Sequence, residues 1–251
     1  MLFAEAPFLE RFGRSRAAGF DAVEFQFPYE FDAADIRKQL DEHELELVLF
    51  NFPAGNFAAG DRGVASDPSR TDDFRVSVET ALTYARVLKP QKMNCLGGKR
   101  LAGVDDSEQR AALISNLRYA ADAVAAEGIE LMIEPLNPYD APDFYLPTPS
   151  SGFSVVAEVA HPNLTVEYDI YHAQRTEGNI VTAIKENLAA IGHIQLADSP
   201  GRNEPGTGEL NWPFIFDQID AVGYTGRIGL EYRPSIERTE DSLSLIREYM
   251  S

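Results

Sequence analysis

The sequence predicts an α/β fold, a (β/α)8 TIM-type barrel of parallel strands alternating with helices. Short apolar runs with strand character alternate along the chain with longer amphipathic stretches, which is the pattern of βαβ units. The pattern repeats about every 30 to 40 residues, as expected for successive strand–helix units. The chain has 251 residues, and one barrel of this kind typically needs roughly 250. We therefore expect one domain over residues 1–251.

Seven runs have strand character, and each is bounded by turn or helix signals. They are Ala22–Phe27, Leu45–Phe52, Met93–Leu96, Glu130–Leu136, Leu164–Ile170, His193–Ala197 and Ile228–Tyr232. Between them, Phe74–Val87 and Ser107–Glu127 have the apolar spacing of helices, and Gly128 ends the second. An open doubly wound sheet is the alternative fold. It usually carries a G-x-G-x-x-G turn after its first strand, and this chain has none.

The start of the chain predicts an unusual barrel. Pro7–Ala18 reads as a helix that stops at Gly19, and the six residues before it, MLFAEA, read as the helix entry. The first strand of an eight-stranded barrel is therefore missing, and we predict a gap between Ala22–Phe27 and Ile228–Tyr232. Open strand edges invite pairing with another chain, so we expect a homo-oligomer in which a partner subunit covers the gap. The alternative is that the true start lies upstream of Met1.

The composition argues against several classes of partner. With 22 Lys and Arg against 40 Asp and Glu, the net charge is −18, which disfavours binding to nucleic acid. No apolar stretch approaches the roughly 20 residues of a membrane span, and the N-terminus lacks the features of a signal peptide. Cys95 is the sole cysteine, so an internal disulfide is excluded. We expect a cytoplasmic protein.

The last four strand runs each carry an oxygen-bearing side chain at or near the end. These residues are Glu134, Asp169, Gln195 and Glu231. In a barrel, such ends converge at the C-terminal mouth, where active sites lie. The converging negative charges need a cation, and oxygen ligands suit Mg²⁺ or Mn²⁺ better than zinc. A multi-zinc site is further disfavoured because the chain has only four histidines.

Segments spread over residues 20 to 232 resemble the hydroxypyruvate isomerases of the xylose isomerase-like barrel superfamily. They are FDAVEFQFPYEF, NFPAGNFAAGDRGVA, NCLGGK, IEPLN, YDIYHAQRTEGN and HIQLADSPGRNEPGTGELN. The resemblance implies that Glu134, Asp169, Gln195 and Glu231 bind the metal, and that Glu134 and Glu231 are the catalytic acid and base. Ketose 3-epimerases usually have histidine as the third ligand, so Gln195 favours the hydroxypyruvate isomerase branch.

The resemblance implies an isomerase that interconverts hydroxypyruvate and tartronate semialdehyde by proton transfer through an enediolate. A divalent metal would stabilise the developing charge. Two sister activities on the same site are alternatives, 2-oxo-tetronate isomerase and a ketose or keto-acid epimerase. A third hypothesis is a barrel that binds a metabolite without converting it. Such a binder needs ligands but no acid–base pair, so the two glutamates argue against it.

The substrate, a small hydroxy-keto acid, carries a carboxylate that needs a cationic cradle. The candidates are Lys99, Arg62 and Arg175, although each could instead be a solvated surface charge. Two histidines are further candidates for contact with substrate, because His172 follows Asp169 by three residues and His193 lies two before Gln195. Glu204 lies in the glycine-rich loop after His193–Ala197, which could move as a lid.

Overall fold

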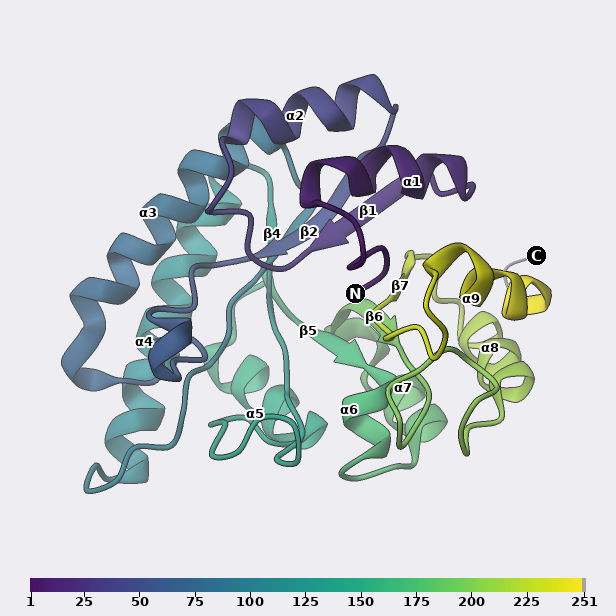
Figure 1. Cartoon of the computed structure of the whole chain (residues 1–251). Helices are drawn as coiled ribbons and strands as arrows, with labels where there is room; N and C mark the ends of the chain where they lie inside the picture. The colour runs from purple at the N-terminus through teal and green to yellow at the C-terminus, as the bar shows by residue number, and fades with distance from the viewer. Residues whose placement is uncertain (250–251) are drawn as a thin grey trace.

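The structure is a computed structural model that describes residues 1–249. Its strands form one parallel seven-stranded sheet in chain order from β1 to β7. They are β1 (Ala22–Phe25), β2 (Glu46–Asn51), β3 (Lys92–Asn94), β4 (Glu130–Ile133), β5 (Leu164–Asp169), β6 (Ile191–Leu196) and β7 (Ile228–Leu230). Each overlaps its predicted run, so the predicted parallel barrel architecture is confirmed. Figure 1 shows the sheet curving through the molecule with its helices outside.

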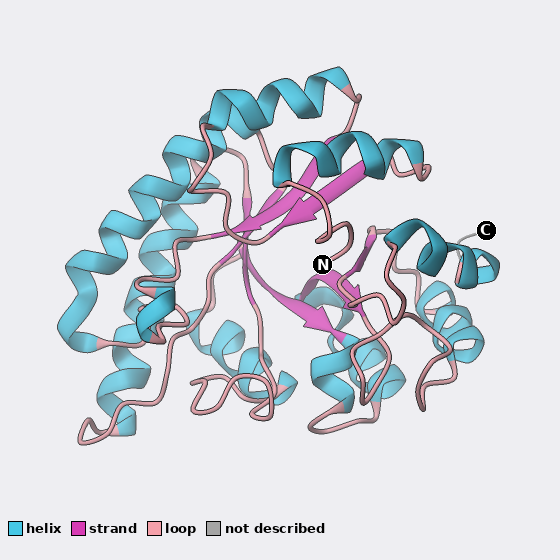
Figure 2. Cartoon of the chain, viewed as in Figure 1, coloured by secondary structure: helices cyan, strands magenta, loops and turns pink. Residues whose placement is uncertain are grey.

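The α-helices connect successive strands and cover the outer face of the sheet (Figure 2). They are α1 (Arg11–Ala17), α2 (Ala33–Glu42), α3 (Thr71–Leu88), α4 (Asp106–Ala125), α5 (Pro149–Val159), α6 (Ile170–Gln174), α7 (Ile180–Asn187), α8 (Trp212–Ala221) and α9 (Thr239–Leu245). Short 3-10 helices add η1 (Phe8–Glu10), η2 (Phe57–Ala59), η3 (Pro68–Arg70), η4 (Leu188–Ala190) and η5 (Arg247–Tyr249). Across residues 1–249, no helix has the length and apolar character needed to cross a bilayer.

Local sequence explains where several of these helices begin and end. The Asp32 carboxylate caps α2 by accepting from the Ala34 N–H, and Thr148 starts α5 with a capping box in front of Pro149. Gly19 follows α1 with φ +101°, a left-handed conformation that glycine adopts without steric cost. The predicted helix over Pro7–Ala18 is therefore present as η1 followed by α1.

Apolar packing lies mainly between the sheet and the helices, whereas the inside of the barrel is partly polar. Phe50, Leu117 and Leu131 belong to one buried cluster, and Ile194 and Trp212 belong to a second one nearer the C-terminus. Inside the barrel, buried polar side chains are in register. Glu167 on β5 pairs with His193 on β6, and Asp169 pairs with Gln195. The sheet thus places polar residues of adjacent strands side by side.

The predicted gap is present between β1 and β7. No hydrogen-bonded pairing joins these two strands in the described part of the chain. Residues 1–6 form turns rather than a strand, and the Phe3 N–H donates to Thr239 Oγ1 at 2.7 Å. Figure 1 shows this segment between β1 and β7, where a cavity of about 460 Å³ opens. The incomplete barrel is confirmed, and its covering by a partner subunit stays a prediction.

Candidate active site

Four strand ends deliver the predicted metal ligands to one end of the barrel. Glu134 directly follows β4 and Glu231 directly follows β7, while Asp169 ends β5 and Gln195 lies one residue before the end of β6. All four are buried, and Glu231, the most exposed, is only 7% accessible. Glu134-Pro135 ends β4 earlier than predicted because proline has no N–H for the next ladder bond. The sequence pattern therefore does correspond to a spatial cluster.

Glu134 and Asp169 lie close together, with His172 beside them. Ligand atoms of the three side chains all lie within 4.8 Å of one another. His172 Nε2 is 3.5 Å from Asp169 Oδ2 and 4.0 Å from Glu134 Oε1. The other oxygen of Asp169 accepts from the Tyr171 N–H at 2.8 Å, which fixes the carboxylate at the start of α6. The structure thus brings His172 to the site, as the sequence predicted.

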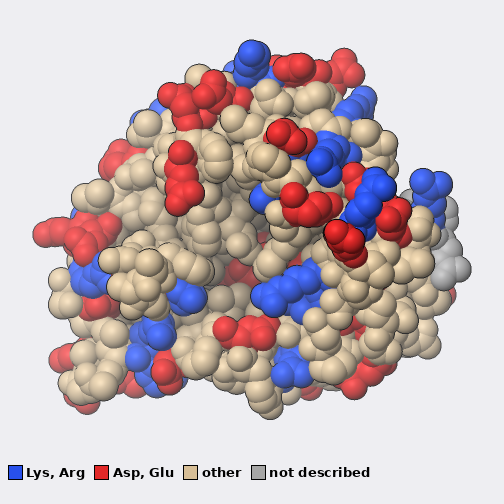
Figure 3. Space-filling model, viewed as in Figure 1, with Lys and Arg blue, Asp and Glu red and all other residues tan. Residues whose placement is uncertain are grey.

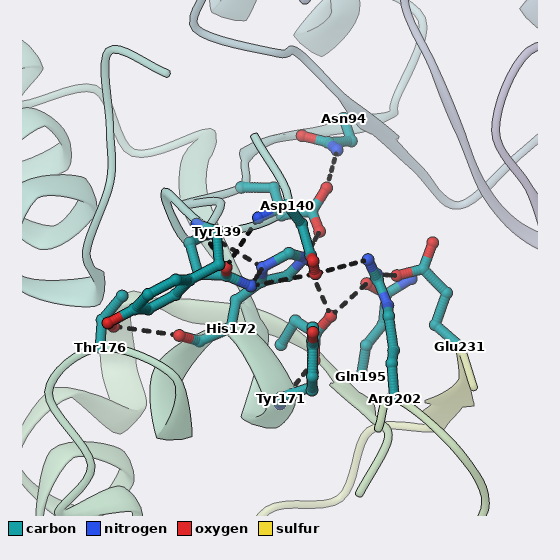
Figure 4. A network of polar contacts seen from close by, with 12 residues as sticks. Asn94, Tyr139, Asp140, Tyr171, His172, Thr176, Gln195, Arg202 and Glu231 are labelled. Atoms are coloured by element: carbon teal, nitrogen blue, oxygen red, sulfur yellow. Dashed lines mark hydrogen bonds and ion pairs between the residues drawn. The ribbon is translucent and has the colours of Figure 1, made fainter. Parts of the chain in front are cut away.

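His172 is arranged as a hydrogen-bond donor rather than as a metal ligand. Its Nδ1 accepts from the main-chain N–H of Asn137 at 3.0 Å and faces Asn137 Nδ2 at 2.7 Å (Figure 4). Burial lowers the pKa of His172 to about 3, so the ring is neutral near pH 7. A neutral ring that accepts at Nδ1 carries its proton on Nε2. That N–H points at the carboxylates and has no hydrogen-bond partner among residues 1–249.

Arg202 is the main site residue that the sequence analysis did not single out. Its Nη2 is 2.7 Å from Glu231 Oε2 and 3.4 Å from Asp169 Oδ2, and its Nη1 is 3.7 Å from Asp140 Oδ2. The guanidinium carbon also lies 5.0 Å from the centre of the Tyr171 ring. Arg202 lies in the GRNEPGTGE segment, so a search of that segment for cations would have found it. It supplies positive charge among the clustered carboxylates.

The loop that carries Arg202 is anchored at several points in the structure, and its movement as a lid stays a prediction. Asp198 Oδ2 accepts from the N–H groups of Gly206 and Gly208 at 2.8 and 3.0 Å. Glu204 is fully buried and accepts from the Ser235 N–H at 2.9 Å and from the Ser235 hydroxyl. Its carboxylate therefore ties the loop to the segment after β7. Its predicted contact with substrate stays a prediction.

The three basic candidates for binding a substrate carboxylate contact aromatic rings or the backbone in the structure. Arg62 stacks on Phe57, with its guanidinium carbon 3.8 Å from the ring centre, and Arg175 stacks on Tyr139 at 4.4 Å. Lys99 is partly exposed and pairs through its backbone with Phe144. None of the three forms an ion pair within residues 1–249. Figure 3 shows basic side chains around a hollow on this face, with acidic atoms deeper inside.

The buried carboxylates fit a divalent cation. Burial raises the pKa of Glu134 well above its usual value, and the charges of Glu231 and Asp169 raise it further. Burial also raises the pKa of Asp169. The amide oxygen of Gln195 is buried and has no hydrogen-bond partner in the described residues. A cation would relieve this repulsion, and Glu134, Asp169 and His172 form a group of side chains that could hold one.

Side chains on or just after β1 and β3 form hydrogen bonds with the predicted metal ligands. Asn94 Nδ2 donates to Glu134 Oε2 at 3.0 Å, and Gln26 Nε2 donates to Glu231 Oε1 at 2.6 Å. Glu24 on β1 contacts His193 and Gln195 on β6, which places His193 inside the barrel below the mouth. The sequence analysis missed Asn94, Gln26 and Glu24 because they lie far along the chain from the residues that they support.

Comparison with known proteins finds similarity along nearly the whole chain. The family model described as "Xylose isomerase-like TIM barrel" matches residues 12–249. The hydroxypyruvate isomerase of Escherichia coli (strain K12) is 44% identical over 234 residues, which cover 93% of this chain and 91% of that protein. The 2-oxo-tetronate isomerase of Cupriavidus necator is 42% identical over 250 residues, covering 100% and 96%. A crystal structure named AP endonuclease, family 2, from Brucella melitensis superposes with a TM-score of 0.95 at 41% identity, covering 99% and 95%.

Proposed function

The chain belongs to the xylose isomerase-like TIM barrel family, and we propose that it is an isomerase that interconverts hydroxypyruvate and tartronate semialdehyde. The observation that carries this proposal is the convergence of two buried glutamates, Glu134 and Glu231, on one site with Asp169 and Gln195. Isomerisation of a hydroxy-keto acid needs a group that removes a proton from one carbon and a group that returns one to its neighbour. The two glutamates provide such a pair.

Glu134, Asp169, Gln195 and Glu231 would hold one Mg²⁺ or Mn²⁺ ion, and this cation supplies Lewis-acid stabilisation of negative charge on the substrate oxygens. The carboxylates that bind it come from β4, β5 and β7, so the substrate would lie over the middle of the barrel mouth. Because these four side chains are buried, the electrostatic interactions among them are stronger than they would be in bulk water.

We assign the proton transfers to the two glutamates. One takes the proton from the hydroxyl-bearing carbon, which gives an enediolate, and the other returns a proton to the adjacent carbon. Each glutamate can exchange a proton with the substrate only if it is held beside the reacting carbons, as positioned acid–base catalysis requires. The N–H at His172 Nε2 would donate to a substrate oxygen, on which charge develops during the reaction.

Arg202 is the strongest candidate for binding the substrate carboxylate, because its guanidinium already lies against the acidic side chains of the site. A guanidinium can donate two parallel hydrogen bonds to a carboxylate. Arg62, Lys99 and Arg175 would then contribute longer-range positive charge at the rim. Under this proposal the substrate carboxylate replaces some of the acidic partners that Arg202 has in the structure.

The sister activity, isomerisation of 2-oxo-tetronate, is the second candidate. It is favoured by the match to the Cupriavidus necator protein, which extends over the whole chain. The two activities use the same proton transfers on substrates of different length. An NMR assay in D₂O with Mg²⁺ or Mn²⁺, run on hydroxypyruvate, 2-oxo-tetronate and a ketose, separates them by product and by rate. Solvent deuterium in the product supports the enediolate route, and its complete absence counts against it.

Replacing either glutamate by its amide keeps the shape but removes the proton-transfer group. We predict that Glu134→Gln and Glu231→Gln each lose at least about 10²-fold in kcat. Each change also removes a charge next to the cation, so the Kd for Mn²⁺ is measured in parallel and the assays are run at saturating metal. Near-normal turnover of either variant with metal bound would contradict the acid–base assignment.

A further inference from the structure

Gln195 differs from the other proposed ligands because its side chain can present either of two chemically different atoms. Only the amide oxygen can bind a cation, whereas the NH₂ group carries donors that would oppose it. In the structure, Gln195 Nε2 donates to Glu24 Oε1 at 2.7 Å. This leaves Gln195 Oε1 buried and without a hydrogen-bond partner in residues 1–249. Which of its two atoms the Gln195 amide presents to a cation therefore depends on the group that contacts Nε2.

Glu24 reaches Gln195 from β1, past the neighbouring strand β7. It projects from β1, and its second oxygen lies 2.8 Å from His193 Nε2, so both oxygens of the carboxylate face nitrogen donors of β6. A carboxylate accepts hydrogen bonds and offers no N–H, so an amide beside it turns its NH₂ group toward it. The opposite orientation would place the Gln195 oxygen against a carboxylate oxygen.

Gly229 makes room for this contact. It lies on β7 as the register partner of Gln195. A Cβ atom built on Gly229 would collide with Glu24 Oε1. The position next to Gln195 on β7 thus has no side chain of its own, and the Glu24 carboxylate fills that space. This is a second observation, independent of the hydrogen bond, that the strands are arranged around the Glu24–Gln195 pair.

We infer that Glu24 is a positioning residue that holds the amide of Gln195 with its oxygen toward the metal ion, in a space that Gly229 leaves open. The inference rests on the proposed function, because it assumes that Gln195 binds the cation. Glu24 does not touch the reacting atoms. It acts through one hydrogen bond, so its effect must disappear when Gln195 has no amide.

The direct test replaces Glu24 by methionine, which has a similar length but cannot hold the amide. The measurement is the Kd for Mn²⁺, from the free-ion EPR signal of the purified full chain. We expect Glu24→Met to weaken Mn²⁺ binding by at least about 10-fold, as loss of an outer partner of a metal ligand commonly does. At saturating Mn²⁺, the loss in kcat of Glu24→Met should be smaller than its loss in Mn²⁺ affinity, because Glu24 has no part in the proton transfers.

Glu167→Gln is the matched control. Glu167 is a more deeply buried acidic side chain inside the barrel, and no hydrogen bond joins it to a proposed ligand among the described residues. Replacing it tests whether any change of an acidic side chain inside the barrel weakens Mn²⁺ binding. We expect a change below about 3-fold, well short of the loss from removing an outer partner. Equal losses in Glu24→Met and Glu167→Gln would overturn the inference.

A double-mutant cycle tests whether Glu24 acts through Gln195. In a Gln195→Ala background, Glu24→Met should change the Kd for Mn²⁺ by less than about 2-fold, because the amide to be oriented is gone. The exchange Glu24→Gln with Gln195→Glu restores one N–H donor and one acceptor, and leaves a carboxylate oxygen for the metal. We expect this double variant to bind Mn²⁺ better than Gln195→Glu alone. A full effect of Glu24→Met without the amide would refute the inference.

Gly229→Ala gives an independent route if Glu24→Met fails to fold. The added methyl group pushes Glu24 away from Gln195, so Mn²⁺ binding should weaken in the same direction, and an unchanged Kd would count against the inference. The proposed function has a separate test. If Gln195→Ala binds Mn²⁺ as tightly as the unaltered chain, the metal site itself is wrong. If Gln195→Ala weakens binding but Glu24→Met does not, only the inference about Glu24 is wrong.

Discussion

Arg202 shows how a single side chain balances the charge of the site. It is largely buried and lies against Glu231, Asp169 and Asp140. Burial works against its positive charge, but the neighbouring carboxylates raise the pKa of Arg202 above its usual value. Removing one partner of a buried charge cluster leaves the others uncompensated. The stability of the protein should therefore depend on Arg202 most strongly when no metal ion is bound.

We predict that Arg202→Met lowers the free energy of unfolding in EDTA by about 3–5 kcal/mol. The difference from the unaltered chain should shrink at saturating Mn²⁺, because the cation takes over part of the neutralisation. Urea denaturation with and without Mn²⁺ measures both effects. Arg175→Met is the control, since Arg175 stacks on Tyr139 and forms no ion pair within residues 1–249. Equal losses in the two variants would show that Arg202 is not the counter-ion.

At the scale of single residues, the sequence predicted where a side chain lies along its strand but not the direction in which a loop side chain points. Glu134, Asp169, Gln195 and Glu231 could be predicted because polar residues ending apolar strands must meet at the barrel mouth. The contacts of Glu204 could not be predicted because a carboxylate in a loop gives no sign of which way it faces, and here it faces Ser235. The contact of Glu24 could not be predicted because its partner, Gln195, lies on β6, and only the folded sheet brings the two together.

The most informative element is the loop between β6 and α8, in which the Asp198 carboxylate accepts several hydrogen bonds. Besides Gly206 and Gly208, Asp198 Oδ2 accepts from the Trp212 indole N–H at 2.9 Å. Asp198 Oδ1 accepts from the Ser199 N–H at 2.8 Å. Asp198 is buried, so its carboxylate has little access to water as an alternative partner. The loop positions Arg202, and Asp198 fixes the loop.

We predict that Asp198→Asn lowers kcat/KM by at least about 10-fold, because small displacements of a positioning group are costly for catalysis. The replacement keeps the size of the side chain but turns one acceptor oxygen into a donor. Hydrogen exchange measured by mass spectrometry should show faster exchange over residues 199–211. Asp217→Asn, on the exposed face of α8, is the control and should leave both measurements unchanged. Unaltered exchange in Asp198→Asn would contradict the assigned role.

Most element positions could be predicted from the sequence, whereas several boundaries could not. Apolar periodicity located all seven strands and the long helices α3 and α4. The observed strand ends differ from the predicted ones where hydrogen bonding to the neighbouring strand determines the boundary. The run Glu130–Leu136 ends as a strand at Ile133, and the run His193–Ala197 begins two residues earlier, at Ile191, where β6 pairs with Val166 of β5. Pairing register depends on the neighbouring strand, so a single run cannot reveal it.

At the scale of the whole molecule, the gap between β1 and β7 sets these two strands apart from the rest. Each pairs on one side only in the described part of the chain, and a cavity lies between them. Backbone amides with fewer buried partners open more easily. The gap could be predicted by counting strand runs, but a single sequence does not reveal what covers the gap.

We predict that amides of β1 and β7 exchange with solvent at least about 10-fold faster than those of β4, which has a paired strand on each side. Hydrogen exchange of the full chain provides the measurement, and sedimentation at the same protein concentration provides the mass. Equal protection in β1, β7 and β4 would contradict an open gap in solution. Equal protection together with a dimer mass would support the expectation that a second copy covers it.

The order of the ligands along the chain has a consequence for synthesis. All four proposed metal ligands lie between Glu134 and Glu231, and the last of them follows the final strand. A ribosome must therefore complete nearly the whole barrel before the ligand set exists. A nascent chain that ends before β7 would carry three of the four ligands but lack one of its two proton-transfer groups. Under the proposed mechanism, the growing polypeptide therefore has no isomerase activity until Glu231 has emerged.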